Sequence, residues 1–188
     1  MADPHESIYE ATLLVAREFD GPHCVEAAAL LVELGSRLGN ELEAIPVSMA
    51  AFSDNGQSVA TGEKGRAFAQ SYLERRGQVA IGGEFEGGSP FERRAGHMIV
   101  VSREDRLLLD PTFSQFKQFG EHAIGLYVSE VDPHKSGKFW EVGDAHLLAR
   151  YFVSDEHLSE LGFDKLRAAA SGRADELAAE VEHRLTSA

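Results

Sequence analysis

The sequence contains a single cysteine among its 188 residues, so no disulfide can form within the chain. This usage is typical of proteins that work in a reducing cytosol. The sequence also lacks any run of about 18 apolar residues, which argues against a transmembrane helix. Its first residues, MADPHESIYE, form neither a basic nor an apolar stretch. We therefore expect no secretory signal and a cytoplasmic location.

Positive charge is scarce in this chain. It has 18 Lys and Arg against 31 Asp and Glu, which gives a net charge of -13. Such a chain repels phosphate backbones and anionic lipids, so neither nucleic acid nor a membrane is an expected partner. The eight histidines form no H-x-x-x-H or H-x-H pair. The glycine-rich residues 82–88 lack the Lys-Ser/Thr ending of a phosphate loop. We therefore expect no metal and no cofactor.

The order of predicted elements indicates the fold class. Helices are predicted over 4–18, 22–38 and 64–76, strands over 43–52, 97–101, 106–110, 123–128 and 145–153, and helix again from 154 onwards. Residues 53–63 and 82–90 read as loops, the second as a lid or a linker. Helices before and after a run of antiparallel strands predict an α+β fold. We expect one domain over residues 1–153, with 154–188 as a helical extension of it.

The lone cysteine stands at the start of a predicted helix. Cys24 follows Pro22 by two residues, and proline suits the first turn of a helix. Unpaired backbone N–H groups and the helix dipole favour negative charge there, and the thiolate is the nucleophilic form of cysteine. The same N–H groups can face a developing oxyanion. Cys24 also shares an apolar stripe with Ala28 and Leu31, so plain packing in the core is the alternative.

A predicted hairpin brings a histidine and an aspartate together. The strands HMIVV and RLLLD flank the polar turn 102–105. A hairpin symmetric about this turn pairs residues whose numbers sum to 207, which places His97 directly opposite Asp110. Their Cβ atoms would then lie about 4.5–5.5 Å apart, close enough for a carboxylate to orient an imidazole. A slip of one residue would move Asp110 to the opposite face. Alternation places Met98, Val100, Leu107 and Leu109 on one face and Ile99, Val101 and Leu108 on the other.

These motifs resemble those of the transglutaminase-like and papain-like superfamily. There a cysteine opens a helix, while a histidine and an aspartate lie on adjacent strands, as GHMIVV and LLLDPT do here. Residues 110–116 are similar to the D-P-T-x-x-Q-F pattern of bacterial and phage members. The resemblance covers roughly residues 20–153. The chain departs from it in two ways: no tryptophan stands beside Cys24 or two residues after His97, and no glutamine precedes Cys24.

The resemblance implies a catalytic triad of Cys24, His97 and Asp110 that transfers an acyl group through a thioester. Without the usual glutamine, His23 or Gln115 is a candidate for the oxyanion site beside the Cys24 backbone. Trp140 is a candidate for the lining of the substrate cleft, with a place in the core as its alternative.

The residues leave the acceptor and the substrate open. Water as acceptor gives a peptidase, an amidase or a protein deamidase, which is the favoured reading. An amine gives a transamidase or an N-acyltransferase. A binding protein that kept the fold without turnover is a third reading. The expected substrate is a protein, a peptide or a small amide. The stripe of Leu177, Val181 and Leu185 on the last helix allows a homodimer contact.

Overall fold

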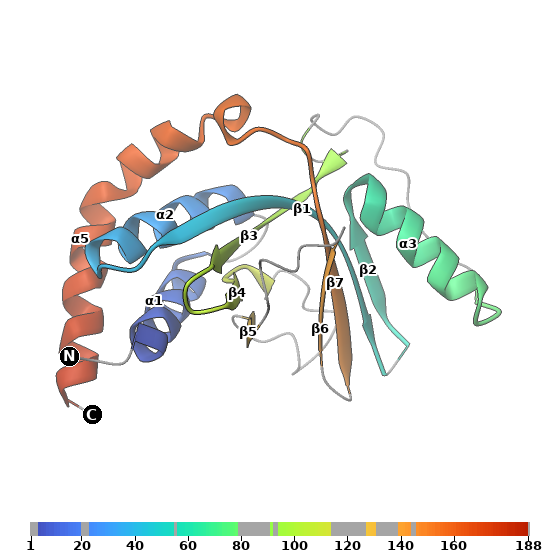
Figure 1. The fold of residues 1–188 in the computed structure, drawn as a ribbon, viewed down its shortest axis with the longest axis horizontal. Helices are drawn as coiled ribbons and strands as arrows, with labels where there is room; N and C mark the ends of the chain where they lie inside the picture. The colour runs from blue at the N-terminus through green and yellow to red at the C-terminus, as the bar shows by residue number, and fades with distance from the viewer. Residues whose placement is uncertain are drawn as a thin grey trace.

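The computed structural model describes residues 4–19, 23–54, 56–78, 91, 94–113, 127–130, 139–143 and 146–187. It has an α+β fold, in which helices surround a curled antiparallel sheet (Figure 1). The helices are α1 (Pro4–Glu18), α2 (Cys24–Arg37), α3 (Gly62–Glu74), the 3-10 helix η3 (Leu158–Leu161) and α5 (Phe163–Ser187). The strands are β1 (Leu42–Ser53), β2 (Ser58–Thr61), β3 (His97–Ser102), β4 (Leu107–Asp110), β5 (Tyr127–Glu130), β6 (Phe139–Gly143) and β7 (Leu147–Val153).

Strand β1 is the centre of the sheet. The strand order is β5-β4-β3-β1-β7-β6, and β2 pairs with β1 outside this path. The first half of β1 pairs with β3, from Leu42 to Val47. Its second half pairs with β7 on the opposite edge, from Val47 to Ser53. The sheet therefore changes partners along one long strand, and Figure 1 shows β1 sweeping from the helical end of the molecule to α3.

The two faces of the sheet carry separate apolar clusters. The cluster on the helical face joins α1, α2 and α5 to one face of β1, β3 and β4, with members such as Leu31, Val100 and Leu177. The cluster on the inner face lies within the curl of the sheet and includes Ile45, Ile99, Trp140 and Tyr151. Helix α3 covers the far half of β1 through Phe52 and Ala69. Burial of both faces explains why β3 is apolar from Met98 to Val101.

Most of the predicted elements are confirmed. The helices over 4–18 and 22–38 correspond to α1 and α2, and the strand over 43–52 corresponds to β1. The faces predicted for β3 and β4 are also correct, since Met98 and Leu109 lie in one cluster and Ile99 and Leu108 in the other. The short strands β2 and β6 were not predicted, and residues 53–63 are therefore not all loop. The predicted loop over 82–90 lies outside the described residues.

The predicted hairpin register is wrong by two residues. Strands β3 and β4 pair Val100 with Leu109 and Ser102 with Leu107, so paired numbers sum to 209. The turn lies one residue later than predicted, because Arg106 adopts a left-handed conformation (φ 60°) and Ser102 remains in the strand. A displacement of two residues keeps every side chain on its predicted face. His97 and Asp110 are therefore diagonal neighbours on one face rather than direct partners.

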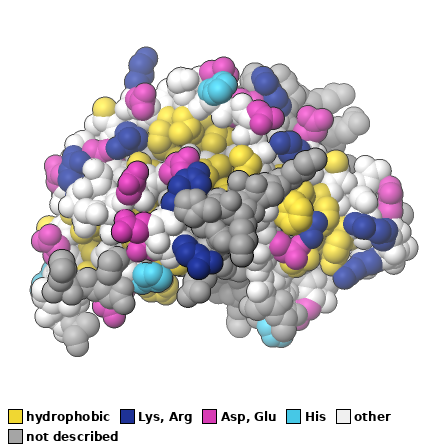
Figure 2. All heavy atoms as spheres, viewed as in Figure 1, with side chains coloured by type: hydrophobic (Ala, Val, Ile, Leu, Met, Phe, Trp, Pro, Cys, Tyr) yellow, Lys and Arg dark blue, Asp and Glu magenta, His cyan; other side chains and the backbone are white. Residues whose placement is uncertain are grey.

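No helix among the described residues is long and apolar enough to cross a lipid bilayer. On the face shown in Figure 2, acidic and basic side chains are interspersed, although the whole chain is strongly acidic.

Candidate active site

The centre of the candidate site is a buried pair formed by a histidine and an aspartate. The Nε2 atom of His97 lies 2.7 Å from Oδ2 of Asp110, within hydrogen-bond distance. Both side chains are completely buried. His97 is the first residue of β3 and Asp110 is the last residue of β4, so the two strands hold the pair at one end of the hairpin. The structure thus brings together the two residues that the sequence predicted to interact.

The Asp110 carboxylate has partners for both of its oxygen atoms. The buried hydroxyl of Tyr151 donates a hydrogen bond to Oδ2 at 3.0 Å, the same oxygen that faces His97. The backbone N–H and the hydroxyl of Thr112 donate to Oδ1 at 3.3 and 3.4 Å. A buried carboxylate is costly unless it is paired and hydrogen-bonded, and here three residues satisfy it. This explains the aspartate-proline-threonine sequence locally, since Pro111 turns the chain so that Thr112 can bind Asp110.

Sequence reasoning did not find Tyr151. This residue lies in β7, which is separated from β3 by the whole of β1 in the sheet order. Its ring also stacks near the imidazole of His97, with ring centroids 6.3 Å apart and an angle of 25° between the planes. The available signal was the alternation of Leu147, Ala149 and Tyr151 in a predicted strand, because a tyrosine on a buried face needs a partner for its hydroxyl.

The environment of His97 favours its protonated form. Burial by itself lowers the pKa of an imidazole. The negative charge and hydrogen bond of Asp110 outweigh this effect, and interactions with Cys24 act in the same direction, so that the pKa of His97 is raised to about 10. His97 is therefore an imidazolium at neutral pH. It can deliver a proton to a leaving group.

Cys24 is the first residue of α2, and its side chain interacts favourably with the imidazole of His97, which contributes to the raised pKa of His97. Because Nε2 of His97 faces Asp110, Nδ1 is the ring nitrogen that can exchange a proton with the thiol. The first bond of the helix runs from the N–H of Ala27 to the carbonyl of His23. The N–H groups of Cys24, Val25 and Glu26 thus have no acceptor within the helix. Cys24 itself is 8% exposed.

The three tentative site residues have different positions. His23 is the exposed residue that precedes α2, and its ring lies 6.1 Å from that of Phe19, measured between centroids. Gln115 lies outside the described residues. Trp140 is 6% exposed, belongs to the cluster on the inner face and also lines a pocket of about 380 Å³. The position of Trp140 is therefore compatible with both interpretations, a core residue and a residue that lines the substrate cleft.

The arrangement allows His97 to exchange protons with the Cys24 thiol, while Asp110 orients the imidazole, and it provides a helix terminus for a negative charge. Within the described part of the chain, no three His, Cys, Asp or Glu side chains gather in a way that could hold a metal ion. The chain was compared with family models, with curated proteins and with solved structures, and none of the three comparisons gave a match.

Proposed function

We propose that this chain is a cysteine-dependent acyl-transfer enzyme with a fold of the transglutaminase-like or papain-like kind. The observation that carries the proposal is the buried hydrogen bond of 2.7 Å between His97 and Asp110, with Cys24 on the same imidazole at a helix start. A buried charged pair has no stabilising advantage over apolar residues of the same size. A chain that keeps such a pair next to its one cysteine fits catalysis better than packing.

Each member of the triad has a distinct role in the proposed reaction. The Cys24 thiolate attacks the carbonyl carbon of an amide, which forms a tetrahedral intermediate with a negative oxygen. The N–H groups of the first turn of α2 can stabilise that oxygen. The His97 imidazolium gives its proton to the leaving amine, which departs and leaves a thioester on Cys24. Asp110 fixes the orientation of the imidazole and stabilises its charge.

The second half of the reaction depends on the acceptor. His97, now neutral, takes a proton from water or from an amine as that acceptor attacks the thioester. The products are an acid in the first case and a new amide in the second, and Cys24 is regenerated in both. Hydrolysis of an amide or peptide bond is the reaction that we propose, since water is the acceptor that is always present. The triad by itself permits transamidation or N-acyl transfer equally well.

Incubation with p-nitrophenyl acetate tests the proposal. We expect an initial burst of p-nitrophenol and an acetyl adduct on the single cysteine, detected by mass spectrometry. The Cys24→Ser variant should show neither. Addition of glycine amide then separates the two acceptors, because a transferase would form acetylglycine amide while a hydrolase would form acetate. Acetylation that is as slow as that of the unfolded protein would sink the proposal.

A further inference from the structure

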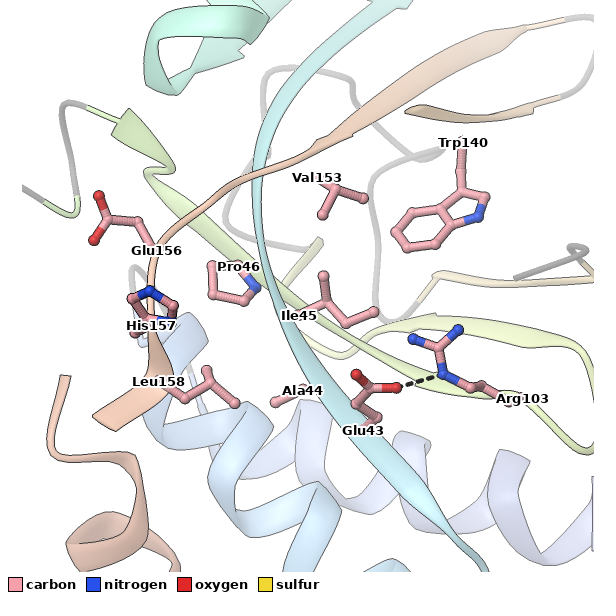
Figure 3. A pocket seen from close by; sticks show the side chains of 10 residues that line it. All are labelled: Glu43, Ala44, Ile45, Pro46, Arg103, Trp140, Val153, Glu156, His157 and Leu158. Carbon is pink, nitrogen blue, oxygen red and sulfur yellow. Dashed lines mark hydrogen bonds and ion pairs between the residues drawn. The ribbon is translucent and has the colours of Figure 1, made fainter. Parts of the chain in front are cut away.

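A pocket that combines apolar walls with hydrogen-bonding groups lies beside the first half of β1 (Figure 3). Its volume of about 380 Å³ is within the range of about 300–1,000 Å³ found for small-ligand sites. Figure 3 shows Ile45 and Val153 near its middle, Trp140 at one side, and Glu156 and His157 across β1. Nothing in the triad chemistry described above uses this pocket.

The pocket opens on the same face of the sheet as the side chains of His97 and Asp110. Val47 pairs with His97 on one side and with Val153 on the other, so these three residues form one row across the sheet. Ile45 pairs with Ile99 in the next row, about 7 Å further along. Directly paired residues project from the same face. The pocket wall formed by Ile45 and Val153 is therefore adjacent to the row of the imidazole.

The backbone of β1 has an unpaired edge at this pocket. The β1–β7 ladder ends at Val47 and Val153, and the last bond on that side runs from the N–H of Ser154 to the carbonyl of Pro46. The N–H and carbonyl of alternate residues point to the same side of a strand, so those of Ala44 point where those of Pro46 do. Ala44 is 5% exposed, yet its N–H and carbonyl have no partner on this edge in the described structure. Buried backbone groups are rarely left unpaired.

The indole of Trp140 is 6% exposed, and Figure 3 shows its six-membered ring toward Val153 and Ile45. Its Nε1–H has no hydrogen-bond partner among the described residues. Each carboxylate that lines the pocket lies near an arginine: Glu43 lies 2.5 Å from Arg103, and Oε1 of Glu156 lies 2.9 Å from Nε of Arg94, although this oxygen accepts no hydrogen bond from the described residues. The pocket thus offers backbone hydrogen bonds and apolar walls, and both of its carboxylates lie near an arginine. This combination suits an uncharged ligand with its own amide groups.

We propose that this pocket binds an extended peptide segment of the substrate, which adds a strand to β1 at Ala44 and places an apolar side chain against Ile45, Val153 and Trp140. The peptide takes the place along β1 that β7 leaves at Ser154. Strand addition supplies main-chain hydrogen bonds for affinity, while pockets for alternate side chains supply specificity. The inference rests on the proposed function, because it makes the acyl donor a protein or a peptide rather than a small amide.

Binding is measured without turnover, on the full-length Cys24→Ser protein. The ¹⁵N-labelled protein is titrated with acetyl-Val-Leu-Val-amide. Because the chain has one tryptophan, its indole N–H gives a single resonance that reports directly on the pocket. We expect saturable shifts of the Trp140 indole and the Ala44 amide. The same peptide with aspartate in place of leucine should bind at least about tenfold more weakly, because an uncompensated charge would enter an apolar site.

Two changes test the strand pairing itself. Ala44→Pro removes the backbone N–H that we propose donates to the peptide, whereas Ala44→Ser keeps it. Pro46, two residues further along β1, already lacks a backbone N–H. We expect Ala44→Pro to weaken binding about three- to tenfold and Ala44→Ser to leave it unchanged. If Ala44→Pro does not fold, single N-methylation along the peptide replaces it. N-methylation should then weaken binding at every second nitrogen of the peptide and leave binding unchanged at the nitrogens between them, as expected when one edge of a strand is paired.

Several results would overturn the inference. These are equal binding of the leucine and aspartate peptides, shifts confined to residues outside the pocket, equal sensitivity at every peptide nitrogen, or binding of leucinamide as tight as that of the tripeptide. Concentration-dependent dimerisation through the same edge, without peptide binding, would assign the edge to a second copy of the chain and would also overturn it. Because Cys24 is absent from this assay, a failure of peptide binding leaves the acetylation test of the triad unaffected.

Discussion

At the scale of single residues, the candidate site depends on how one carboxylate is held. Asp110 receives hydrogen bonds from β7 through Tyr151, from its own turn through Thr112, and faces the imidazole of His97. Each donor offsets part of the cost of burying the charge. The loss of one donor should therefore cost more than the loss of an ordinary surface hydrogen bond.

Tyr151→Phe tests this support. The substitution keeps the ring and removes the hydroxyl that donates to Asp110. We expect the free energy of unfolding, measured in urea, to fall by about 1–3 kcal/mol, because one donor to a buried carboxylate is lost. Tyr72→Phe is the matched control, since Tyr72 is half-buried on α3, its ring packs on Arg76 and on neighbouring apolar side chains, and no described hydrogen bond involves its hydroxyl. It should change stability by less than about 0.5 kcal/mol. Equal effects of the two substitutions would contradict this account of Tyr151.

The raised pKa of His97 predicts a pH dependence of stability. A group whose pKa is higher in the folded state stabilises the fold fully below its unfolded pKa of about 6.5, and this contribution is lost as the pH rises through the folded pKa of about 10. Between these values the unfolding free energy should fall by up to about 1.4 kcal/mol per pH unit. The measurement compares Cys24→Ala with Cys24→Ala/His97→Gln, so that the thiol adds no proton of its own. Parallel pH profiles of the two proteins would show that His97 is not protonated at neutral pH.

At the scale of elements, sequence patterns predicted which strands form and which faces they bury. They did not predict the register of the β3–β4 hairpin, because register depends on the turn. A left-handed conformation at Arg106, which few arginines adopt, moves the turn by one residue. The Ser102 hydroxyl also closes the turn by donating to the Asp105 carboxylate. The pair of His97 and Asp110 survives this error because a displacement of two residues preserves the faces.

Short strands and distant contacts were harder to predict. Strand β6 has only five residues and alternates between exposed and buried side chains, a pattern that short loops also show. Strand β2 has four residues and only one strand partner. The contact from Tyr151 to Asp110 arises from sheet order, which local periodicity does not contain. Cys24, His97 and Asp110 could therefore be predicted from their residue types and local positions. Tyr151 could not, because only the order of strands in the sheet brings it to Asp110.

Helix α3 approaches β1 so closely that a glycine is required. A Cβ atom built at Gly65 would lie 2.2 Å from the Met49 carbonyl oxygen, whereas one at Gly172 in α5 would meet nothing within 4 Å. We expect Gly65→Ala to destabilise the protein by about 1–3 kcal/mol, since backbone atoms must move. Gly172→Ala should instead stabilise it by about 0.5–1 kcal/mol through helix propensity. Urea unfolding of both variants measures the difference, and the same sign for both would contradict the close approach.

At the scale of the whole molecule, α5 shares a core with the helix that carries Cys24. Leu177 of α5 is 1% exposed and lies in the same apolar cluster as Leu31 of α2. Ion pairs reinforce the contact, with Arg37 of α2 bound to Asp175 of α5 at 2.6 Å. Helix α5 therefore packs against α2, the helix that carries Cys24, and the two helices should unfold together.

Leu177→Ala tests this coupling. We expect a loss of about 2–5 kcal/mol in unfolding free energy, because the substitution leaves a cavity in the shared core. Leu185→Ala, a half-buried neighbour on the same helix, is the milder control. The unfolding of the variant should follow one transition whether helix content or Trp140 fluorescence is observed, since Trp140 lies in the other cluster. Loss of helix content at a lower urea concentration than the fluorescence change would show that α5 unfolds separately.

The most direct test of the proposed triad is the rate at which iodoacetamide alkylates Cys24 between pH 5 and pH 9. The urea-unfolded protein serves as the reference for a free thiol, with a pKa of about 8.5. In the folded protein, we predict that alkylation is already fast near pH 6, and that His97→Gln, which can still donate to Asp110, slows it at that pH by about tenfold or more. A folded protein whose alkylation rises only near pH 8.5, with no change in His97→Gln, would contradict the catalytic assignment of Cys24, His97 and Asp110.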